Sequence, residues 1–349
     1  MSSARPAAPP RAGADRGAPL LQVRGLRTSF FTRDGEVKAV DGVDLVLERG
    51  RTLGLVGESG CGKSVTSLSL MRLVRAPGRI VGGEILLDGT DLRKVSEDQM
   101  RAVRGARISM IFQEPMTSLN PVLTCGFQIG EVIREHQRLT GARLKAKVID
   151  SLKMVGIPQP DRRYDAYPHE LSGGLRQRVV IAMALACDPD VLIADEPTTA
   201  LDVTIQAQIL GLLKEQRKRR GMALLLITHD LGVIAEMADG VAVMYAGQIV
   251  EHADVQSLFK SPKHPYTVGL LSSLPTLATT RTQRLHAIAG TVPNMLRLPP
   301  GCRFAPRCPR VMDVCRDRPP LLQPVDDRRL VSCHLYPPAE QGDRATVIA

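Results

Sequence analysis

The segment Gly57-Glu-Ser-Gly-Cys-Gly-Lys-Ser64 decides the fold, because it matches the phosphate-binding pattern G-x4-G-K-[ST]. An apolar run, Leu53 to Val56, precedes it and predicts a strand, and residues 64–73 follow it in a helical pattern. Glycines let the backbone curl so that its N–H groups point at phosphate oxygens, and the helix adds its positive N-terminal end. We therefore expect Lys63 to reach the β- and γ-phosphates of a nucleotide and the Ser64 hydroxyl to ligate Mg²⁺.

A second motif, Val191-Leu-Ile-Ala-Asp-Glu-Pro197, is an apolar strand that ends in two carboxylates. In a phosphate-loop fold, Asp195 stands where a second partner for Mg²⁺ is needed. Glu196 is adjacent and can polarise an attacking water. Alone, the pair is as well explained as a solvated Asp-Glu turn, but the phosphate loop favours the catalytic interpretation.

A third motif, Leu171-Ser-Gly-Gly-Leu-Arg-Gln-Arg178, opens a predicted helix. A serine followed by two glycines leaves backbone N–H groups free to bind an anion. Ordinary N-capping by Ser172 is the simpler alternative. Because the chain already has an anion site in its phosphate loop, the repetition suggests that this segment serves a second nucleotide.

Alternating strand and helix patterns predict an α/β fold with a mostly parallel sheet flanked by helices. We expect residues 1–19 to be a disordered lead and 20–260 to form the main domain, with a helical subdomain over about 115–185. After Ser261 prolines become dense and regular periodicity fades, so 261–349 is predicted to be an irregular C-terminal extension.

Composition narrows the class of protein further. The chain has 349 residues and a formal charge of +10, which invites a nucleic-acid interpretation. Aromatic residues make up only 3% of the chain and tryptophan is absent, so stacking platforms for bases are few and we expect no nucleic-acid partner. We find no apolar run long enough to cross a membrane and no signal-peptide pattern, and we expect a cytosolic location.

The three motifs occur in the order and spacing of the nucleotide-binding domains of ABC ATPases, which this chain resembles. Three further positions match that family: Gln113 in Ile-Phe-Gln-Glu-Pro, Asp202 in Thr-Ala-Leu-Asp, and His229 in Ile-Thr-His-Asp. The resemblance covers residues 21 to about 340 and is closest to the first, D-type, ATPase subunit of dipeptide and oligopeptide importers. Leu175 departs from the general pattern, since many members have glutamine there, and we interpret it as a subfamily feature.

This resemblance implies a site for ATP and Mg²⁺. Glu196 would orient water, His229 would stabilise charge on the γ-phosphate, and Gln113 would sense Mg²⁺, with Ser64, Gln113 and Asp195 as metal ligands. Adenine is expected to stack on Phe30, with Phe31 as the neighbouring choice and Val40 packing nearby. The implied nucleotide site comprises Phe30, Val40, Gly57, Glu58, Ser59, Gly60, Cys61, Gly62, Lys63, Ser64, Val65, Gln113, Ser172, Gly173, Gly174, Asp195 and Asp202.

The resemblance also implies partners. Two ATPase subunits would meet head to tail, so that Ser172, Gly173 and Gly174 contact the partner's γ-phosphate. A heterodimer with a second ABC ATPase is expected, although the sequence does not distinguish it from a second copy. The pair would dock on two transmembrane permease subunits at the cytoplasmic face of the membrane, served indirectly by an extracytoplasmic solute-binding protein.

The expected function is ATP hydrolysis that powers import of di- and oligopeptides. An importer of nickel or another solute remains an alternative, because cargo choice resides in the partner proteins. Non-transport ABC ATPases are disfavoured, since the chain has one phosphate loop and no sustained heptad run.

Four cysteines, Cys302, Cys308, Cys315 and Cys333, lie close together in the C-terminal extension, with spacings x5, x6 and x17. Four thiolates suit Zn²⁺ or an iron–sulfur cluster. No C-x2-4-C pair typical of structural zinc is present among the four, and the resemblance implies a [4Fe–4S] cluster. Unligated thiols are the third possibility. Nothing in the sequence places these cysteines near ATP, so we expect a structural or regulatory role and no part in hydrolysis.

Overall fold

The computed structural model describes residues 19–113, 118–199, 201–273 and 288–336. Contacts within the chain divide it into two compact units. Among the described residues, one unit contains 49–51 and 94–225, and the other contains 19–48, 52–93 and 226–336. The phosphate loop belongs to the second of these, the carboxylate strand to the first.

In the unit that contains the phosphate loop, the chain begins with an antiparallel sheet of order β2-β1-β4-β5. Strands β1 (Leu21–Thr32) and β2 (Gly35–Leu47) pair around Asp34-Gly35. Strand β4 (Gly78–Leu87) pairs with β1 as far as Gly78. Strand β5 (Thr90–Asp91) completes the sheet.

A second sheet in this unit runs in the order β11-β12-β10-β9-β3. Strand β9 (Gly240–Tyr245) pairs in parallel with β3 (Thr52–Val56) and antiparallel with β10 (Gln248–Asp254). Every residue of β3 is buried, which explains its continuous apolar run. The helices of this unit are α1 (Lys63–Leu70), α9 (Leu231–Met237), α10 (Val255–Lys260), α11 (Pro265–Ser272), the 3₁₀ turn η2 (Ala305–Arg307) and α12 (Val314–Asp317).

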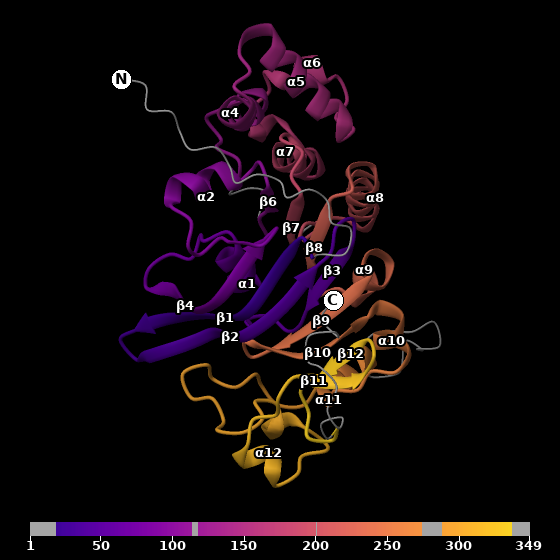
Figure 1. Ribbon diagram of the computed structural model, residues 1–349. Coiled ribbons are helices and arrows are strands. Elements are labelled where there is room, and N and C mark those ends of the chain that lie inside the picture. The colour runs from indigo at the N-terminus through magenta and orange to yellow at the C-terminus, as the bar shows by residue number, and fades with distance from the viewer. Residues whose placement is uncertain (1–18, 114–117, 200, 274–287, 337–349) are drawn as a thin grey trace. The chain divides into compact units, whose positions relative to one another are not determined.

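Regular structure continues in the predicted extension, contrary to the irregular chain expected after Ser261. Strand β12 (Arg329–Val331) pairs with β10 and with β11 (Gln323–Asp326), so the extension shares a sheet with the preceding domain (Figure 1). The periodicity is faint because these strands are short. The predicted domain boundary near 260 stays a prediction, since a shared sheet does not by itself locate it.

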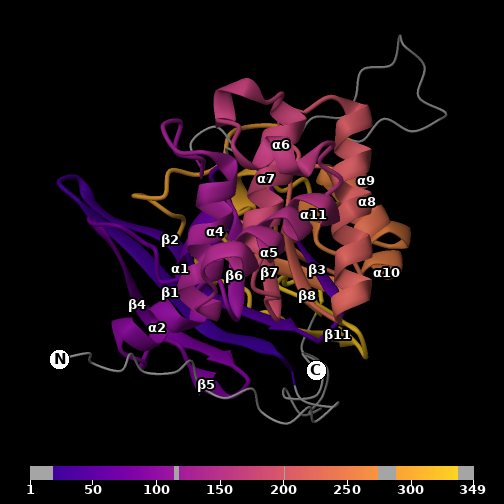
Figure 2. The ribbon, with the colours of Figure 1, turned by 90° about the horizontal axis from the view of Figure 1, so that it is seen from above.

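The other unit contains a group of helices, α4 (Cys125–Gln137), α5 (Gly141–Met154), α6 (Pro160–Tyr164) and α7 (Gly173–Leu185), which lie together in both ribbon views (Figures 1 and 2). They fall within the segment predicted to be a helical subdomain. Strand β6 (Ile108–Ile111) pairs in parallel with β7 (Val191–Asp195), next to which β8 (Ala223–Ile227) lies. The remaining elements are α2 (Glu97–Val103), the 3₁₀ turn η1 (Pro168–Glu170) and α8 (Val203–Arg220).

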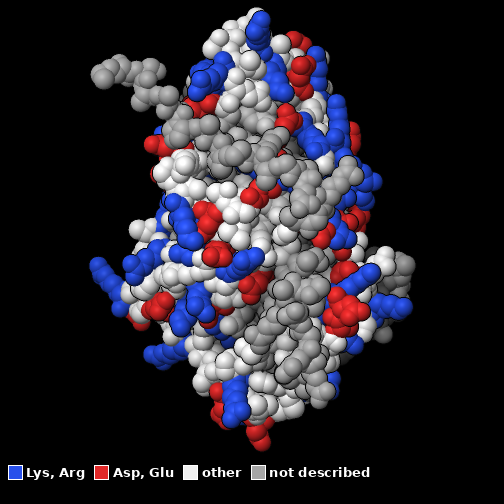
Figure 3. Space-filling view, viewed as in Figure 1, with Lys and Arg blue, Asp and Glu red and all other residues white. Residues whose placement is uncertain are grey.

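Charges of both signs are mixed on one face of the molecule, where its residues are described. On the face that Figure 3 shows, Lys and Arg side chains are interspersed with Asp and Glu and form no continuous basic surface. Within the described parts of the chain, none of the helices combines the length and the apolar character needed to cross a bilayer.

Candidate functional site

The phosphate loop has a backbone that only glycine adopts easily. Gly57, Gly60 and Gly62 have φ angles of 153°, 77° and 110°, respectively. A Cβ atom on Gly57 would lie 2.1 Å from the carbonyl oxygen of Met244, and one on Gly62 would lie 2.3 Å from that of Ala39. The loop therefore lies directly against neighbouring backbone, and its shape is fixed by close packing as well as by torsion angles.

Lys63 is folded into this loop. Its side chain is buried, and Nζ donates hydrogen bonds to the carbonyl oxygens of Gly57, at 2.7 Å, and Glu58, at 3.0 Å. Helix α1 begins at Lys63, so its N-terminal end faces the loop, as predicted. Burial raises the pKa of the Cys61 thiol, which therefore adds no negative charge where an anion is expected.

The residues predicted to contact adenine lie on β1 and β2. Val40 is buried and follows Ala39, whose carbonyl faces Gly62. The Phe30 ring packs closely on Gly78, since a Cβ there would meet Cε1 at 2.6 Å. The neighbouring Phe31 ring is covered by the guanidinium of Arg79, 4.2 Å from the ring centroid. Adenine stacking on Phe30 stays a prediction.

In the other unit, β7 places the two carboxylates where the sequence predicted them. Asp195 is buried at the end of the strand, and Glu196 follows with a φ angle of 48°, a left-handed conformation uncommon outside glycine. The Glu196 carboxylate accepts hydrogen bonds from Nε2 of Gln113, at 3.2 Å, and from the Thr199 hydroxyl, at 2.9 Å. The structure thus brings together two predicted site residues that are far apart in sequence.

The start of α7 is exposed. Ser172 is its N-cap and accepts a hydrogen bond from the Leu175 N–H at 3.4 Å. A Cβ on Gly174 would meet Ile205 at 2.9 Å, whereas one on Gly173 would meet nothing closer than Leu201 at 4.0 Å. Capping, the simpler interpretation, is therefore present, and the space beside the exposed Gly173 leaves room for an anion as well.

Two other predicted residues lie at or next to helix caps. Asp202 is the N-cap of α8 and accepts from the Ile205 N–H at 3.0 Å. His229 is exposed after β8, between Thr228 and Asp230, whose N–H donates to the Thr228 hydroxyl at 3.0 Å. These bonds fix the backbone on either side of the histidine, whose role in hydrolysis stays a prediction.

The four cysteines of the C-terminal region carry free thiols. The Cys302 N–H donates to the Cys315 carbonyl at 2.8 Å, and Gly301 permits this approach because a Cβ there would lie 2.3 Å from the same oxygen. Burial, and then the charges of the other three thiols, raises the pKa of Cys333 to about 11. Across the described residues, no three His, Cys, Asp or Glu groups are arranged to hold a metal ion. The side-chain arrangement therefore supports neither the iron–sulfur cluster nor the zinc alternative, and both stay predictions.

One part of the phosphate-loop environment was missed by sequence reasoning. Glu58 is contacted by Tyr266 of α11 and Arg307 of η2, both from the C-terminal region. Tyr266 lies near the start of α11, and nothing in the sequence around it indicated contact with a loop more than two hundred residues earlier.

Comparisons with known proteins agree with this geometry. Residues 40–199 match the family described as ABC transporter, and residues 250–315 match the one described as oligopeptide/dipeptide transporter, C-terminal region. The oligopeptide transport ATP-binding protein AppD of Bacillus subtilis is 52% identical over 91% of this chain and 97% of its own. The dipeptide transport ATP-binding protein DppD of the same organism is 51% identical, over 90% and 94%.

Solved structures show the same fold. The dimeric structure of MJ0796, a bacterial ABC transporter cassette, has a TM-score of 0.61 at 26% identity, covering 67% of this chain and 98% of its own. A post-hydrolysis state of that cassette, bound to ADP and Pi, has the same TM-score at 25% identity. With identity above one half over nearly the whole of a curated relative, the chain belongs to the ATP-binding subunits of the oligopeptide and dipeptide ABC transporter family.

Proposed function

We propose that this chain binds and hydrolyses ATP to power the uptake of di- and oligopeptides through partner permease subunits. The observation that carries the proposal is the 52% identity that extends over 97% of an oligopeptide transport ATP-binding protein. The match to the oligopeptide/dipeptide C-terminal region favours peptides over nickel and disfavours a non-transport ATPase.

The site residues divide the chemistry between them. The loop N–H groups and Lys63 bind the phosphates, and Glu196, oriented by Gln113 and Thr199, positions the attacking water. Oxygen donors on Ser64, Asp195 and Gln113 are the ligands that Mg²⁺ prefers, and when bound the ion neutralises phosphate charge. His229 is assigned to stabilising charge on the γ-phosphate.

The exposed start of α7 supports a head-to-tail partner. Its glycine N–H groups and the Ser172 hydroxyl would contact the γ-phosphate of ATP held by a second ABC ATPase subunit. Docking of this pair on two permease subunits would place the chain peripherally on the cytoplasmic face of the membrane, where an extracytoplasmic binding protein delivers the peptide to the permeases.

We also propose that the four cysteines hold a [4Fe–4S] cluster with a structural or regulatory role. Four free thiols within one region fit its ligand chemistry, and burial together with the neighbouring thiols raises the pKa of Cys302 and of Cys333. A cluster spreads its ligands over several iron atoms, so it does not require thiols to meet at one point. Anaerobic purification should give a brown protein with about four irons per chain. A colourless preparation with no iron would contradict the proposal.

Peptide uptake tests the transport function. The gene is deleted in its host, and uptake of labelled di- and oligopeptides and of nickel is measured after complementation with wild-type chain or with Glu196→Gln at equal expression. Peptide uptake restored by the wild type alone is the expected result. Restored nickel uptake without peptide uptake would favour the alternative cargo.

A further inference from the structure

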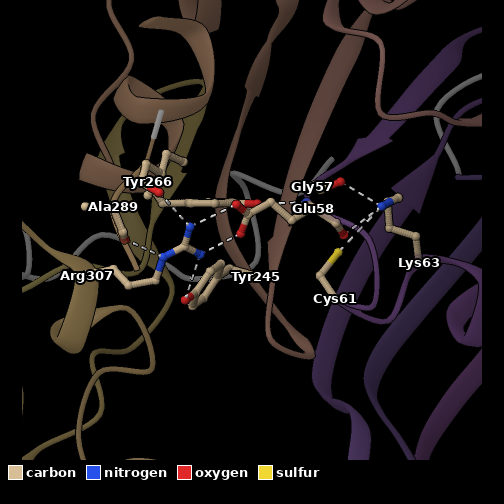
Figure 4. Close-up of polar contacts among 9 residues, drawn as sticks. Gly57, Glu58, Cys61, Lys63, Tyr245, Tyr266, Ala289 and Arg307 are labelled. Atoms are coloured by element: carbon tan, nitrogen blue, oxygen red, sulfur yellow. Dashed lines mark hydrogen bonds and ion pairs between the residues drawn. The ribbon is translucent and has the colours of Figure 1, made fainter. Parts of the chain in front are cut away.

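The Glu58 carboxylate, in the phosphate loop, is paired with an arginine from the cysteine-bearing C-terminal region. Arg307 donates from Nη1 to Oε2 at 2.6 Å and from Nη2 to Oε1 at 3.0 Å, so the two groups form a paired, charge-assisted contact (Figure 4). The residues stand 249 positions apart in the sequence. A side chain of the extension thus reaches the loop that binds phosphate.

Arg307 is rigidly held. Its side chain is only 4% exposed, Nε donates to the Ala289 carbonyl at 3.0 Å, and Nη2 also donates to the Ile288 carbonyl at 3.3 Å (Figure 4). Nη1 lies 3.4 Å from the Tyr245 hydroxyl. With its donors satisfied by fixed acceptors, the guanidinium presents a positive charge to Glu58 in one geometry.

The backbone of Glu58 is held as well. Its N–H donates to the Tyr266 hydroxyl at 2.8 Å, and its carbonyl accepts from Lys63 Nζ at 3.0 Å. Tyr266 is fully buried and packs on Tyr245 and Phe304, with ring centroids 4.6 and 5.4 Å away. Movement of Glu58 would therefore move the carbonyl that positions the catalytic lysine.

A carboxylate in this loop also has an electrostatic cost. ATP is a polyanion, and an uncompensated negative charge within about 10 Å of it weakens binding roughly tenfold at the effective dielectric constant of a protein surface. The Arg307 guanidinium offsets this charge. Neutralisation and positioning thus come from the same contact.

We propose that Arg307 is a positioning residue of the ATP site: by pairing with Glu58, it neutralises the phosphate loop and holds it in the shape that receives ATP. The proposal rests on the assignment of this loop to ATP. It also makes the turn η2 part of the site's support, because this turn carries Arg307. Arg303, four residues earlier, contacts Asp41 and the Ala246 carbonyl instead of Glu58.

The test is the equilibrium affinity of the purified full-length chain for ATP. Arg307→Met keeps much of the side-chain volume but removes the charge, and we expect it to weaken binding roughly tenfold. Arg307→Lys should lose less, since it restores charge without the paired geometry. The double variant Glu58→Gln/Arg307→Met should regain most of the affinity, because no uncompensated carboxylate is left. A purely structural role of Arg307 predicts no such rescue.

Arg303→Met is the matched control, because it removes a second buried arginine from the same segment without touching Glu58. Arg303→Met should change ATP affinity less than twofold, while it lowers the unfolding temperature about as much as Arg307→Met does. Equal affinity of wild type and Arg307→Met, absence of rescue in the double variant, or an equal loss in Arg303→Met would overturn the proposal. If Arg307→Met does not fold, the same comparison is made with the charge-removing variants Arg307→Gln and Glu58→Gln/Arg307→Gln. Failure of the wild type itself to bind ATP would instead refute the proposed function.

Discussion

The phosphate loop and the start of α7 are both glycine-containing segments that lead into a helix, but the structure supports them differently. The loop has three glycines with positive φ angles, packs against the carbonyls of Ala39 and Met244, and has Lys63 folded into it. The start of α7 has ordinary glycine conformations, an exposed surface and one long cap bond from Ser172.

On the proposed assignment, the phosphate loop is a preformed anion site, whereas the start of α7 needs a partner to complete its site. The phosphate loop is held by contacts on several sides before any nucleotide binds. Binding therefore loses little conformational entropy in this loop, because folding has already ordered it. The start of α7 is exposed, and we propose that it acts when a partner subunit brings a second nucleotide to it. Variants in the two segments should therefore fail in different assays.

The largest effect, on ATP affinity, is expected for Lys63→Ala in the phosphate loop. Removing the only long cationic donor of the loop should weaken ATP binding by about 100-fold or more, because a charge-assisted contact with phosphate is lost. Equilibrium binding to the isolated chain measures it, with Lys218→Ala, at the exposed end of α8, as a charge-matched control. Unchanged affinity in Lys63→Ala would show that the loop is not the ATP site.

Glu196→Gln should separate binding from chemistry. The substitution keeps the shape of the side chain but removes the carboxylate, so ATP affinity should be retained while turnover falls roughly 100-fold or more. Single-turnover hydrolysis in the assembled transporter is the measurement, with the partner's site disabled so that it does not mask the loss. Turnover near the wild-type rate would mean that another group orients the water.

Gly173→Ala tests the start of α7, which is proposed to contact the partner's nucleotide. No atom lies within 4.0 Å of the added Cβ apart from Leu201 at that limit, so the fold should accept the methyl group. ATP affinity of the isolated chain should stay the same, and hydrolysis by the complex should fall about tenfold, since one lost anion contact is typically worth about 1.4 kcal/mol or more.

If Gly173→Ala lowered ATP affinity in the isolated chain as much as it lowered hydrolysis in the complex, the distinction between the two segments would be lost. Robust hydrolysis by the wild-type chain alone that does not vary with protein concentration or with added partner would have the same consequence, because a complete site would then exist within one subunit.

The smallest effect is expected for Ser172→Ala, where the quantity measured is the free energy of unfolding. Loss of an N-cap costs about 1 kcal/mol, and the long bond to Leu175 places this cap at the weak end of the range. The shift in the urea midpoint should be no larger than that of Thr124→Ala, which removes the cap of α4 at 3.2 Å. A much larger shift would show that Ser172 supports the fold beyond its own helix.

Much of the architecture was predictable because it follows local patterns. The strands β3 and β7 lie where their apolar runs predicted them, and α1 follows the phosphate loop as its helical pattern predicted. The C-terminal strands were missed because three or four residues carry too little periodicity to be recognised.

The sequence by itself determined the phosphate loop, the carboxylate pair and the glycines at the start of α7, because each is a contiguous motif whose functional groups lie within a few residues of one another. Only the tertiary structure decided that Gln113 contacts Glu196 and that Arg307 and Tyr266 hold Glu58. Contacts between residues far apart in sequence depend on how helices and strands pack, and this packing produces no recognisable pattern in the local sequence. For this reason the link between the cysteine-bearing region and the ATP site became apparent only in three dimensions.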